Sequence, residues 1–201
     1  MPISKQVMLR TGEAATIRAP EPTDAAAVLA HAQAVMTESE FNITTPAEFT
    51  MTEMQERDWL QGFLEKPGHL ALVAEVDGAL VGFLHFAVSH RQRLAHHGAL
   101  GISVKKSHWG RGIGKALMET LLAWATDEPG VEKVCLAVVA TNERAVRLYQ
   151  NLGFMEEGRR IKEVKFGPGR YEDDLLMYRW VKSPPLPSTV LQDAPNHHAP
   201  F

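Results

Sequence analysis

The sequence has a single cysteine, no excess of positive charge and no long hydrophobic run, and each shortage excludes a class of protein. Because Cys135 has no second cysteine in the chain to pair with, we expect it to behave as a small hydrophobic residue. A formal net charge of −3 argues against nucleic acid as a partner, because nucleic-acid binding normally requires a basic face. No apolar stretch reaches the roughly 18 residues that a membrane span requires, and the first residues lack a signal-peptide core. We therefore expect a cytoplasmic protein that binds neither nucleic acid nor a membrane.

What the sequence does contain suits one domain with short additions. Its 201 residues are 45% apolar, which is enough to build a sizeable core. We expect residues 1–15 to form an N-terminal strand or extension, and residues 16–182 to form the main domain. Residues 183–201 hold five of the twelve prolines and show no periodicity, so we expect an extended or disordered tail there.

Hydrophobic periodicity and turn residues indicate the order of the elements. Thr52 and Gln55 have the spacing of a capping box that begins a helix, and Asp77-Gly78 lies between two apolar runs, as in a β-hairpin. The run "VCLAVVA" is apolar on both faces, which favours a central strand. The full order is two strands, two helices, three strands, a helix, a strand, a helix and two strands. This order predicts a mixed sheet with helices on both faces.

Three glycines at alternate positions, Gly110, Gly112 and Gly114, lead into a predicted helix in "HWGRGIGKALM". The free amide N–H groups and the dipole of a helix N-terminus attract anions, and glycine allows a phosphate to approach them closely. Arg111 and Lys115 add positive charge. The spacing of the glycines fits neither a Walker loop nor a dinucleotide fingerprint. Two interpretations stay open: a site for a phosphate-bearing ligand, or a tight turn from strand to helix.

A second motif lies in "TNERAVRLYQNLGF", where Asn142, Ala145 and Tyr149 share one face of a short predicted helix. Together with the strand "GISV", the turn "GRGIGK" and the strand "LAVVA", it closely resembles the GCN5-related N-acetyltransferases, the GNAT superfamily. The resemblance covers residues 16–182. It implies an α/β (α+β) GNAT fold, with a central mixed sheet of about seven strands and helices on both faces.

The glycine turn carries the other half of this resemblance. The family pattern is Gln/Arg-x-x-Gly-x-Gly/Ala at the start of the long helix. Gly112 and Gly114 match its two small positions, whereas Trp109 replaces the usual Gln or Arg. Since this exchange leaves the backbone N–H groups in place, the turn keeps its capacity to bind a phosphate.

The resemblance also implies a co-substrate, acetyl-CoA, and a role for each matching residue, with no metal required. The backbone amides that would hold the pyrophosphate are those of Arg111, Gly112, Ile113, Gly114 and Lys115. The strand residues Ile102, Ser103 and Val104 would pair with the pantetheine arm, and a main-chain amide there would polarise the thioester carbonyl. Asn142 and Ala145 would line the cofactor. Tyr149, which is protonated at neutral pH, would be the general acid towards the departing thiolate.

The residues that would handle the acceptor are less clearly marked. Many members of the family carry a glutamate base at the position of Ala137, so the proton of the attacking amine needs another route. His97, Glu38 and Glu40 are the candidates, either directly or through water. Glu38 and Glu40 also lie close to Phe41 in the sequence, so together these three could receive a cationic amine. The resemblance implies a small-molecule amine or amino acid as the acceptor and a homodimer as the assembly.

Several functions remain open from the sequence alone. The first is an acetyl-CoA-dependent N-acetyltransferase of a small primary amine or an amino acid, with an N-terminal or protein acetyltransferase as a variant. The second is a non-catalytic acyl-CoA-binding sensor, which the alanine at position 137 favours. The third is an interaction domain that presents the proline-rich segment, residues 183–201, to a partner.

Overall fold

The computed structural model describes residues 3–182, which form one eight-stranded sheet with four α-helices. The strands are β1 (Ser4–Met8), β2 (Ala14–Arg18), β3 (Leu70–Val76), β4 (Ala79–Val88), β5 (His97–Val104), β6 (Lys133–Val139), β7 (Met155–Gly167) and β8 (Arg170–Trp180). The helices are α1 (Ala25–Glu38), α2 (Glu53–Leu64), α3 (Ile113–Asp127) and α4 (Glu143–Asn151). The predicted α/β class and element order are confirmed, with eight strands in place of the about seven that the resemblance implied. The predicted tail, residues 183–201, lies outside the described residues.

The sheet is mixed and has the strand order β1-β2-β3-β4-β5-β6-β8-β7. Every neighbouring pair in it is antiparallel except β5 and β6, which are parallel. A parallel pair needs a crossover connection, and α3 lies within the connection between these two strands. The described part of the expected N-terminal extension contributes β1 and the start of β2 to one edge of the same sheet.

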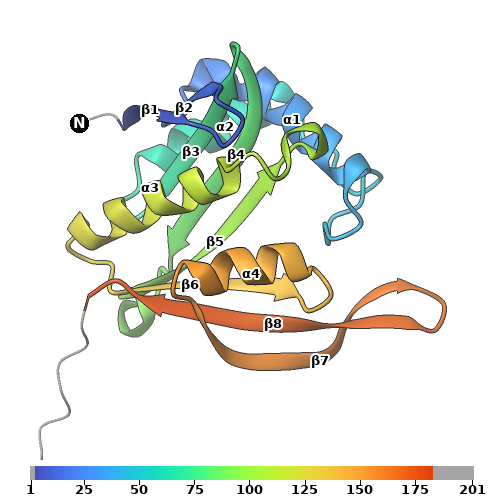
Figure 1. Cartoon of the computed structure of the whole chain (residues 1–201). Coiled ribbons are helices and arrows are strands. Elements are labelled where there is room, and N and C mark those ends of the chain that lie inside the picture. The colour runs from blue at the N-terminus through green and yellow to red at the C-terminus, as the bar shows by residue number, and fades with distance from the viewer. Residues whose placement is uncertain (1–2, 183–201) are drawn as a thin grey trace, which may run out of the picture.

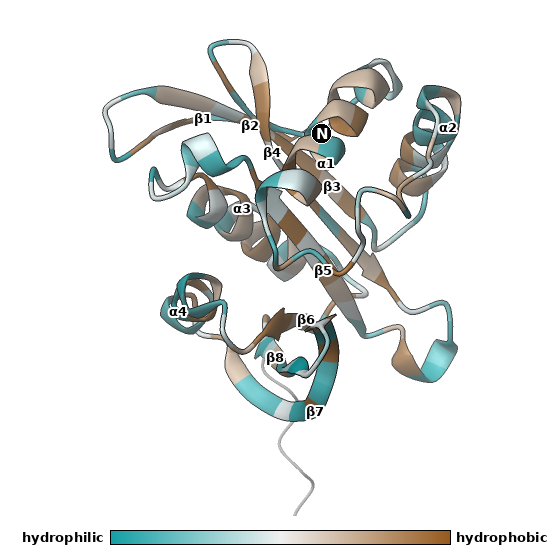
Figure 2. Ribbon diagram, turned by 90° about the vertical axis from the view of Figure 1, so that its right-hand side faces the viewer, coloured by the Kyte–Doolittle hydropathy of each residue, from teal (hydrophilic) through white to brown (hydrophobic). Residues whose placement is uncertain are grey.

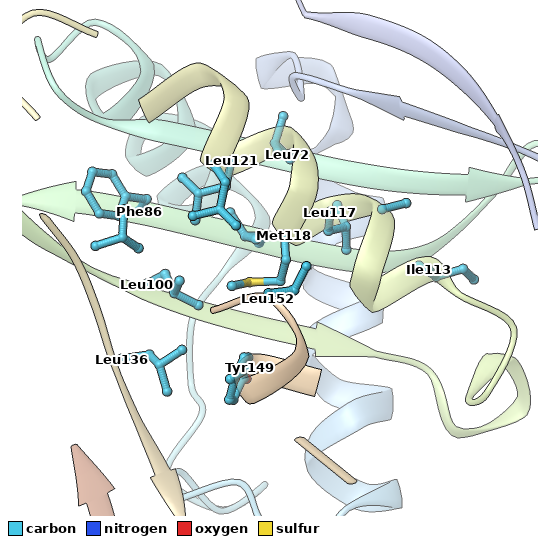
Figure 3. Close-up of a cluster of buried hydrophobic side chains, with 14 of the residues drawn as sticks. Leu72, Phe86, Leu100, Ile113, Leu117, Met118, Leu121, Leu136, Tyr149 and Leu152 are labelled. Carbon is cyan, nitrogen blue, oxygen red and sulfur yellow. The ribbon is translucent and has the colours of Figure 1, made fainter. Parts of the chain in front are cut away.

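Helices cover both faces of this sheet, with α3 and α4 on one face and α1 and α2 on the other (Figures 1 and 2). The main core lies under α3, whose stripe of Ile113, Leu117 and Leu121 is fully buried. Figure 3 shows these side chains beside Leu72 and Phe86 of the sheet. A smaller core lies between the sheet and the pair α1 and α2. None of the helices in residues 3–182 is both long and apolar enough to cross a membrane.

Two of the local signals in the sequence are present as hydrogen bonds or backbone angles. At the start of α2, the side chain of Thr52 accepts from the N–H of Gln55, and the side chain of Gln55 accepts from the N–H of Thr52. This is the predicted capping box. In the turn between β3 and β4, Asp77 and Gly78 both have positive φ, as a tight two-residue hairpin requires.

Candidate active site

The two central strands β5 and β6 start as neighbours and then separate (Figure 1). Only His97–Ala99 of β5 pairs with Lys133–Cys135 of β6. Beyond these residues, β5 continues to Val104 and β6 to Val139 without pairing to each other. The far half of β5 therefore has β4 on one side and an open edge on the other.

This open edge of β5 presents backbone N–H groups to the split between the strands. The N–H of Lys105 donates to the carbonyl of Val81, next to β4, so it points away from the split. Because N–H directions alternate along a strand, those of Ile102 and Val104 point into the split. In the described part of the chain neither of them donates to another strand, so both are available to a ligand lying along β5.

A cavity of about 460 Å³ opens at this split. It brings together residues from the open half of β5, the glycine turn, the end of β6 and helix α4. The predicted cofactor residues in its wall are Ile102, Ser103, Val104, Gly112, Ile113, Gly114, Lys115, Asn142, Ala145 and Tyr149. The two sequence motifs, at residues 110–115 and 142–149, thus meet in one concave site.

The glycine turn forms one part of the cavity wall. Gly110 has a φ of +77° and Gly112 a φ of +103°, a left-handed conformation that other residues rarely adopt. Gly112 caps α3, which begins at Ile113. Among the described residues, no backbone N–H from Gly110 to Lys115 donates to a backbone carbonyl. These free donors, together with the positive end of the α3 dipole, give the turn the capacity to bind an anion.

Helix α4 contributes the second motif. The Oδ1 atom of Asn142 accepts from the N–H of Ala145 at 3.3 Å and caps the helix. Tyr149 is 6% exposed, and Figure 3 shows it close to Leu152 and Leu136. Burial raises the pKa of Tyr149 to about 12. At neutral pH the side chain is therefore a neutral phenol that can donate a proton into the cavity.

Comparison with known proteins decides the family. Residues 34–154 match the acetyltransferase (GNAT) family. The chain belongs to this family. It is 32% identical over 121 residues to the L-amino acid N-acetyltransferase AaaT of Escherichia coli strain K12, a match that covers 60% of this chain and 74% of AaaT. It is 26% identical over 167 residues to the prophage-derived N-acetyltransferase YokL of Bacillus subtilis, which covers 82% of this chain and 89% of YokL.

Solved structures of GNAT proteins share this fold. A GNAT-family acetyltransferase from Streptococcus pneumoniae superposes with a TM-score of 0.79 at 28% identity, covering 83% of this chain and 98% of that one. The acetyltransferase yncA from Salmonella typhimurium, solved with its cofactor acetyl-CoA, has a TM-score of 0.75 at 21% identity, covering 87% and 98%. As a GNAT member, the protein is an N-acetyltransferase whose co-substrate is acetyl-CoA.

This GNAT site differs from the family pattern at Trp109, and the structure shows what takes the place of the usual Gln or Arg. The indole N–H of Trp109 donates to the carbonyl of Val104. On the face of its ring lies the guanidinium of Arg144, 3.5 Å from the centroid. Arg144 also lines the cavity. Position 109 carries no positive charge here. Arg144 of α4 thus places one next to the glycine turn.

Three further predicted residues take different positions around this GNAT site. Phe41 lines the main cavity. The side chain of Arg111 lies outside the cavity wall and pairs with Glu13 at 3.0 Å, while its backbone N–H remains one of the free donors of the turn. His97 begins β5 at the end where β5 is paired with β6, and it is not part of the wall. The structure thus brings Phe41 to the cavity and leaves His97 away from it.

The two acidic candidates for the amine, Glu38 and Glu40, are engaged in other contacts. Glu38 accepts a 2.7 Å hydrogen bond from the N–H of Lys106. Glu40 pairs with Arg170 at 2.8 Å, which connects the segment after α1 to β8. Neither residue is part of the cavity wall. Their geometry therefore gives them positions beside the site rather than in it.

Two buried polar residues at the site were missed from the sequence. Asp174 of β8 is 2% exposed and lines the main cavity. His31 of α1 is 1% exposed, with Nε2 at 2.9 Å from Oγ of Ser103, and its Nδ1 has no partner within residues 3–182. Burial lowers the pKa of His31 to about 4, so the ring is neutral. The only signal for His31 was its place on the apolar stripe between Val28 and Val35.

A second hollow, of about 350 Å³, adjoins the first. It lies on the α1 and α2 face of the sheet and shares Val35, Asn42, Ile102 and Ser103 with the main cavity. Ser103 of β5 therefore stands at the boundary between the main cavity and the second hollow.

Proposed function

We propose that this acetyltransferase transfers the acetyl group of acetyl-CoA to the primary amine of a small molecule or an amino acid, by direct attack on the thioester. The observation that carries the proposal is the single cavity where free amide donors, an open strand edge and a buried phenol meet. The names of two relatives support this class of acceptor: an L-amino acid N-acetyltransferase and a phosphinothricin N-acetyltransferase, each 32% identical over the matched region.

In this proposal the glycine turn binds the pyrophosphate of acetyl-CoA. The backbone N–H groups of residues 110–115 donate to its oxygens, and Lys115 and Arg144 add positive charge beside them. The pantetheine arm lies along the open edge of β5 at Ile102–Val104 and accepts hydrogen bonds there as an added strand would. Asn142 and Ala145 form the opposite wall from α4.

Acyl transfer then needs donors for a developing oxyanion and a proton for the departing sulfur. The N–H of Ile102 or Val104, preorganised by the strand, stabilises the oxyanion of the tetrahedral intermediate. Tyr149 gives its proton to the thiolate as the C–S bond breaks. Burial raises the pKa of this phenol, and it raises the pKa of a thiol in the same cavity as well, so burial does not by itself widen the difference in pKa between donor and acceptor.

We also propose that the enzyme works in the cytoplasm as a homodimer, with the family resemblance as the support. Light scattering on the purified full chain tests the assembly. A mass of twice the 22.3 kDa chain supports the dimer, and a mass of one chain contradicts it.

The direct test of the proposed function combines binding and turnover. Acetyl-CoA is titrated into the protein by calorimetry, and thiol release and product mass are then followed with a panel of primary amines and amino acids. Binding with thiol release and an acetylated small amine supports the proposal. Binding without release from any amine would make the protein a non-catalytic acyl-CoA sensor. Release with peptide N-termini alone would make it a protein acetyltransferase.

A further inference from the structure

The second hollow differs in chemical character from the main cavity. Its walls come from α1, α2, the segment before α2, and the strands β4 and β5. Large apolar side chains dominate these walls, among them Met36, Phe49, Met51, Trp59 and Phe83. The rings of Trp59 and Phe83 are tilted against each other with centroids 6.4 Å apart. Such walls favour an apolar occupant with a flat, polarisable surface.

The ionisable side chains of this hollow point to the same conclusion. Within residues 3–182 they are His31, Glu56 and His85, and no Lys or Arg of that part of the chain lines the wall. Burial lowers the pKa of both histidines and raises that of Glu56, so burial disfavours the charged form of all three. An acidic group placed here would find no cation, and an ammonium group would find a single carboxyl that is itself poorly solvated. An uncharged group is the occupant that costs least to desolvate.

We propose that the second hollow holds the side group of the acceptor amine, and that this group is aromatic or an apolar group of similar size. The inference rests on the proposed function, because the amine must reach the thioester at the Ser103 boundary between the hollows. A hollow of about 350 Å³ accommodates one such group. The Glu56 carboxyl, in the wall of the hollow and 5% exposed, can serve an isolated polar atom at the edge of a ring, such as a phenol.

A panel of acceptors tests this assignment. Phenethylamine, tyramine, L-phenylalanine and L-methionine represent the expected class, and ethanolamine, L-glutamate and spermidine represent small, acidic and polycationic amines. We expect kcat/KM for the apolar class to exceed that of the others by at least about tenfold, as burial of one large apolar group allows. A preference for spermidine, glutamate or ethanolamine overturns the assignment and leaves the proposed function standing. Transfer to none of these amines overturns both.

A substitution that fills the second hollow tests whether the side group of the acceptor amine binds there. Ala32 lines the hollow, whereas Ala30 is exposed on the same helix, so Ala32→Phe and Ala30→Phe are a matched pair. Ala32→Phe should raise KM for phenethylamine at least about tenfold and leave the Kd of acetyl-CoA unchanged, whereas Ala30→Phe should change neither. If Ala32→Phe fails to fold, Ala32→Leu fills the same space with a smaller group. An unchanged KM for phenethylamine in a folded filling variant contradicts the assignment.

A separate observation concerns the buried carboxyl of Asp174. It lies in the wall of the main cavity together with Tyr149 and Ala137. In the pairing of β6 with β8, Val139 lies opposite Asp174, and Ala137 lies opposite Leu176. Opposed residues of an antiparallel pair project from the same face, so Asp174 and Ala137 share a face as diagonal neighbours about 7–8 Å apart. The carboxyl therefore lies close to the exposed methyl group of Ala137, where the sequence offered no base.

We infer that Asp174 takes up the proton of the acceptor amine. The charged groups that act on it are Arg160 and Glu163 from β7, and Tyr149 from α4 lines the same cavity. On this face of β6 its neighbours Val139 and Ala137 are uncharged, whereas Cys135 and Lys133 lie further along the strand. The nearest, Arg160, lies at 3.5 Å from Oδ2, with half of its own side chain in solvent. Burial is the largest effect on the pKa of Asp174 and raises it, Arg160 lowers it and Glu163 raises it; the net rise strengthens Asp174 as a base.

The proton transfers balance with Asp174, Tyr149 and water alone. As the amine nitrogen bonds to the acetyl carbon, its proton passes to the Asp174 carboxylate, directly or through one water. The C–S bond breaks and Tyr149 protonates the thiolate. The proton on Asp174 then returns through water to the tyrosinate, which leaves an amide, CoA thiol and the resting enzyme.

Asp174→Asn tests this role, and Asp173→Asn is its control because Asp173 lies on the other face and pairs with Arg159 at 3.2 Å. Asp174→Asn should lower kcat at least about 100-fold and remove the acidic limb of its pH profile, with the Kd of acetyl-CoA unchanged. Asp173→Asn should keep both kcat and the limb. Asp174→Glu retains a carboxylate and should retain the limb. If Asp174→Asn does not fold, Asp174→Glu serves as the test. A folded Asp174→Glu enzyme whose kcat profile lacks the acidic limb contradicts the role of Asp174 as proton acceptor.

An Asp174→Asn enzyme with wild-type kcat and an intact acidic limb overturns this role. Thiol release by the wild type is measured independently of it, so failure of the Asp174 assignment leaves the proposed function untouched.

Discussion

The indole N–H of Trp109 donates a 2.7 Å hydrogen bond to the carbonyl oxygen of Val104, which ties the start of the glycine turn to the end of β5. The guanidinium of Arg144 lies over the same ring, 3.5 Å from its centroid. One aromatic side chain thus connects β5, the turn and α4. Because β5 and β6 are separated here, this contact sets the spacing between the free amides of the turn and the open strand edge.

Trp109→Phe removes the hydrogen bond to Val104 and keeps an aromatic ring beneath Arg144. We expect the Kd of acetyl-CoA to rise about fivefold, since one such hydrogen bond contributes about 1 kcal/mol. Calorimetric titration measures the change. Trp180→Phe is the control, because Trp180 lies at the end of β8 next to His96, outside the cavity wall. An unchanged Kd for Trp109→Phe would show that the contact does not position the turn.

Gly114 offers the cleanest test of the glycine turn, because its backbone is helical, whereas Gly112 has a φ of +103° and would be strained by any side chain. Gly114 lies in the cavity wall, and a Cβ there would lie 3.4 Å from Leu148, so a valine adds bulk at the wall where little room is left. Gly114→Val should raise the Kd of acetyl-CoA at least about tenfold.

Gly130→Val is the matched control for this substitution. A Cβ at Gly130 meets nothing within 4 Å, so we expect its Kd for acetyl-CoA to equal that of the wild type. Equal affinity in a folded Gly114→Val protein would mean that the glycines only turn the chain from β5 into α3.

Tyr149→Phe removes the proton donor and keeps the buried ring. We expect kcat to fall about 100-fold, the usual contribution of a general acid, while the Kd of acetyl-CoA stays the same. Steady-state thiol release and calorimetry give the two values. Tyr178→Phe, on β8 beside Lys133, should leave both unchanged. A Tyr149→Phe enzyme with wild-type kcat contradicts the assignment of the general acid.

The neutral His31 makes stability depend on pH. Burial lowers its pKa from 6.5 to about 4, so between these values the unfolded chain binds a proton that the folded protein does not. His31 therefore has no effect on the pH dependence of the unfolding free energy above pH 6.5. Below that value the unfolding free energy falls, and it continues to fall as the pH approaches 4. Between pH 7 and pH 4.5 we expect the wild type to lose about 2 kcal/mol more unfolding free energy than His31→Gln. Urea denaturation at each pH measures this, and parallel curves for the two proteins would contradict it.

Much of the fold could be predicted because its signals are local. The capping box of Thr52 and Gln55, the Asp77-Gly78 turn and the stripe of α3 each depend on residues a few positions apart. That the glycine turn and the α4 motif belong to one site could be predicted for the same reason, since each motif is continuous in sequence, and both line the main cavity. A local pattern was less informative for "VCLAVVA". It is a central strand as predicted, but Ala137 on one face is exposed to the cavity.

The acceptor side of the site could not be predicted, because long-range packing builds it. Asp174 reaches the cavity only through the pairing of β8 with β6, and His31 meets Ser103 from 72 positions away. The sequence indicates no ion-pair partner for Glu40, but its side chain pairs with Arg170, 130 positions further along the chain. No periodicity or spacing in a single sequence reports such contacts.

A crystal structure of the protein with acetyl-CoA is the most direct test of the claim that the split between β5 and β6 is the cofactor site. We predict the pyrophosphate oxygens within hydrogen-bond distance of the backbone N–H groups of residues 110–115, and the thioester beside Ile102–Val104, facing Tyr149. Acetyl-CoA bound elsewhere, or with its pyrophosphate away from the glycine turn, would contradict this claim.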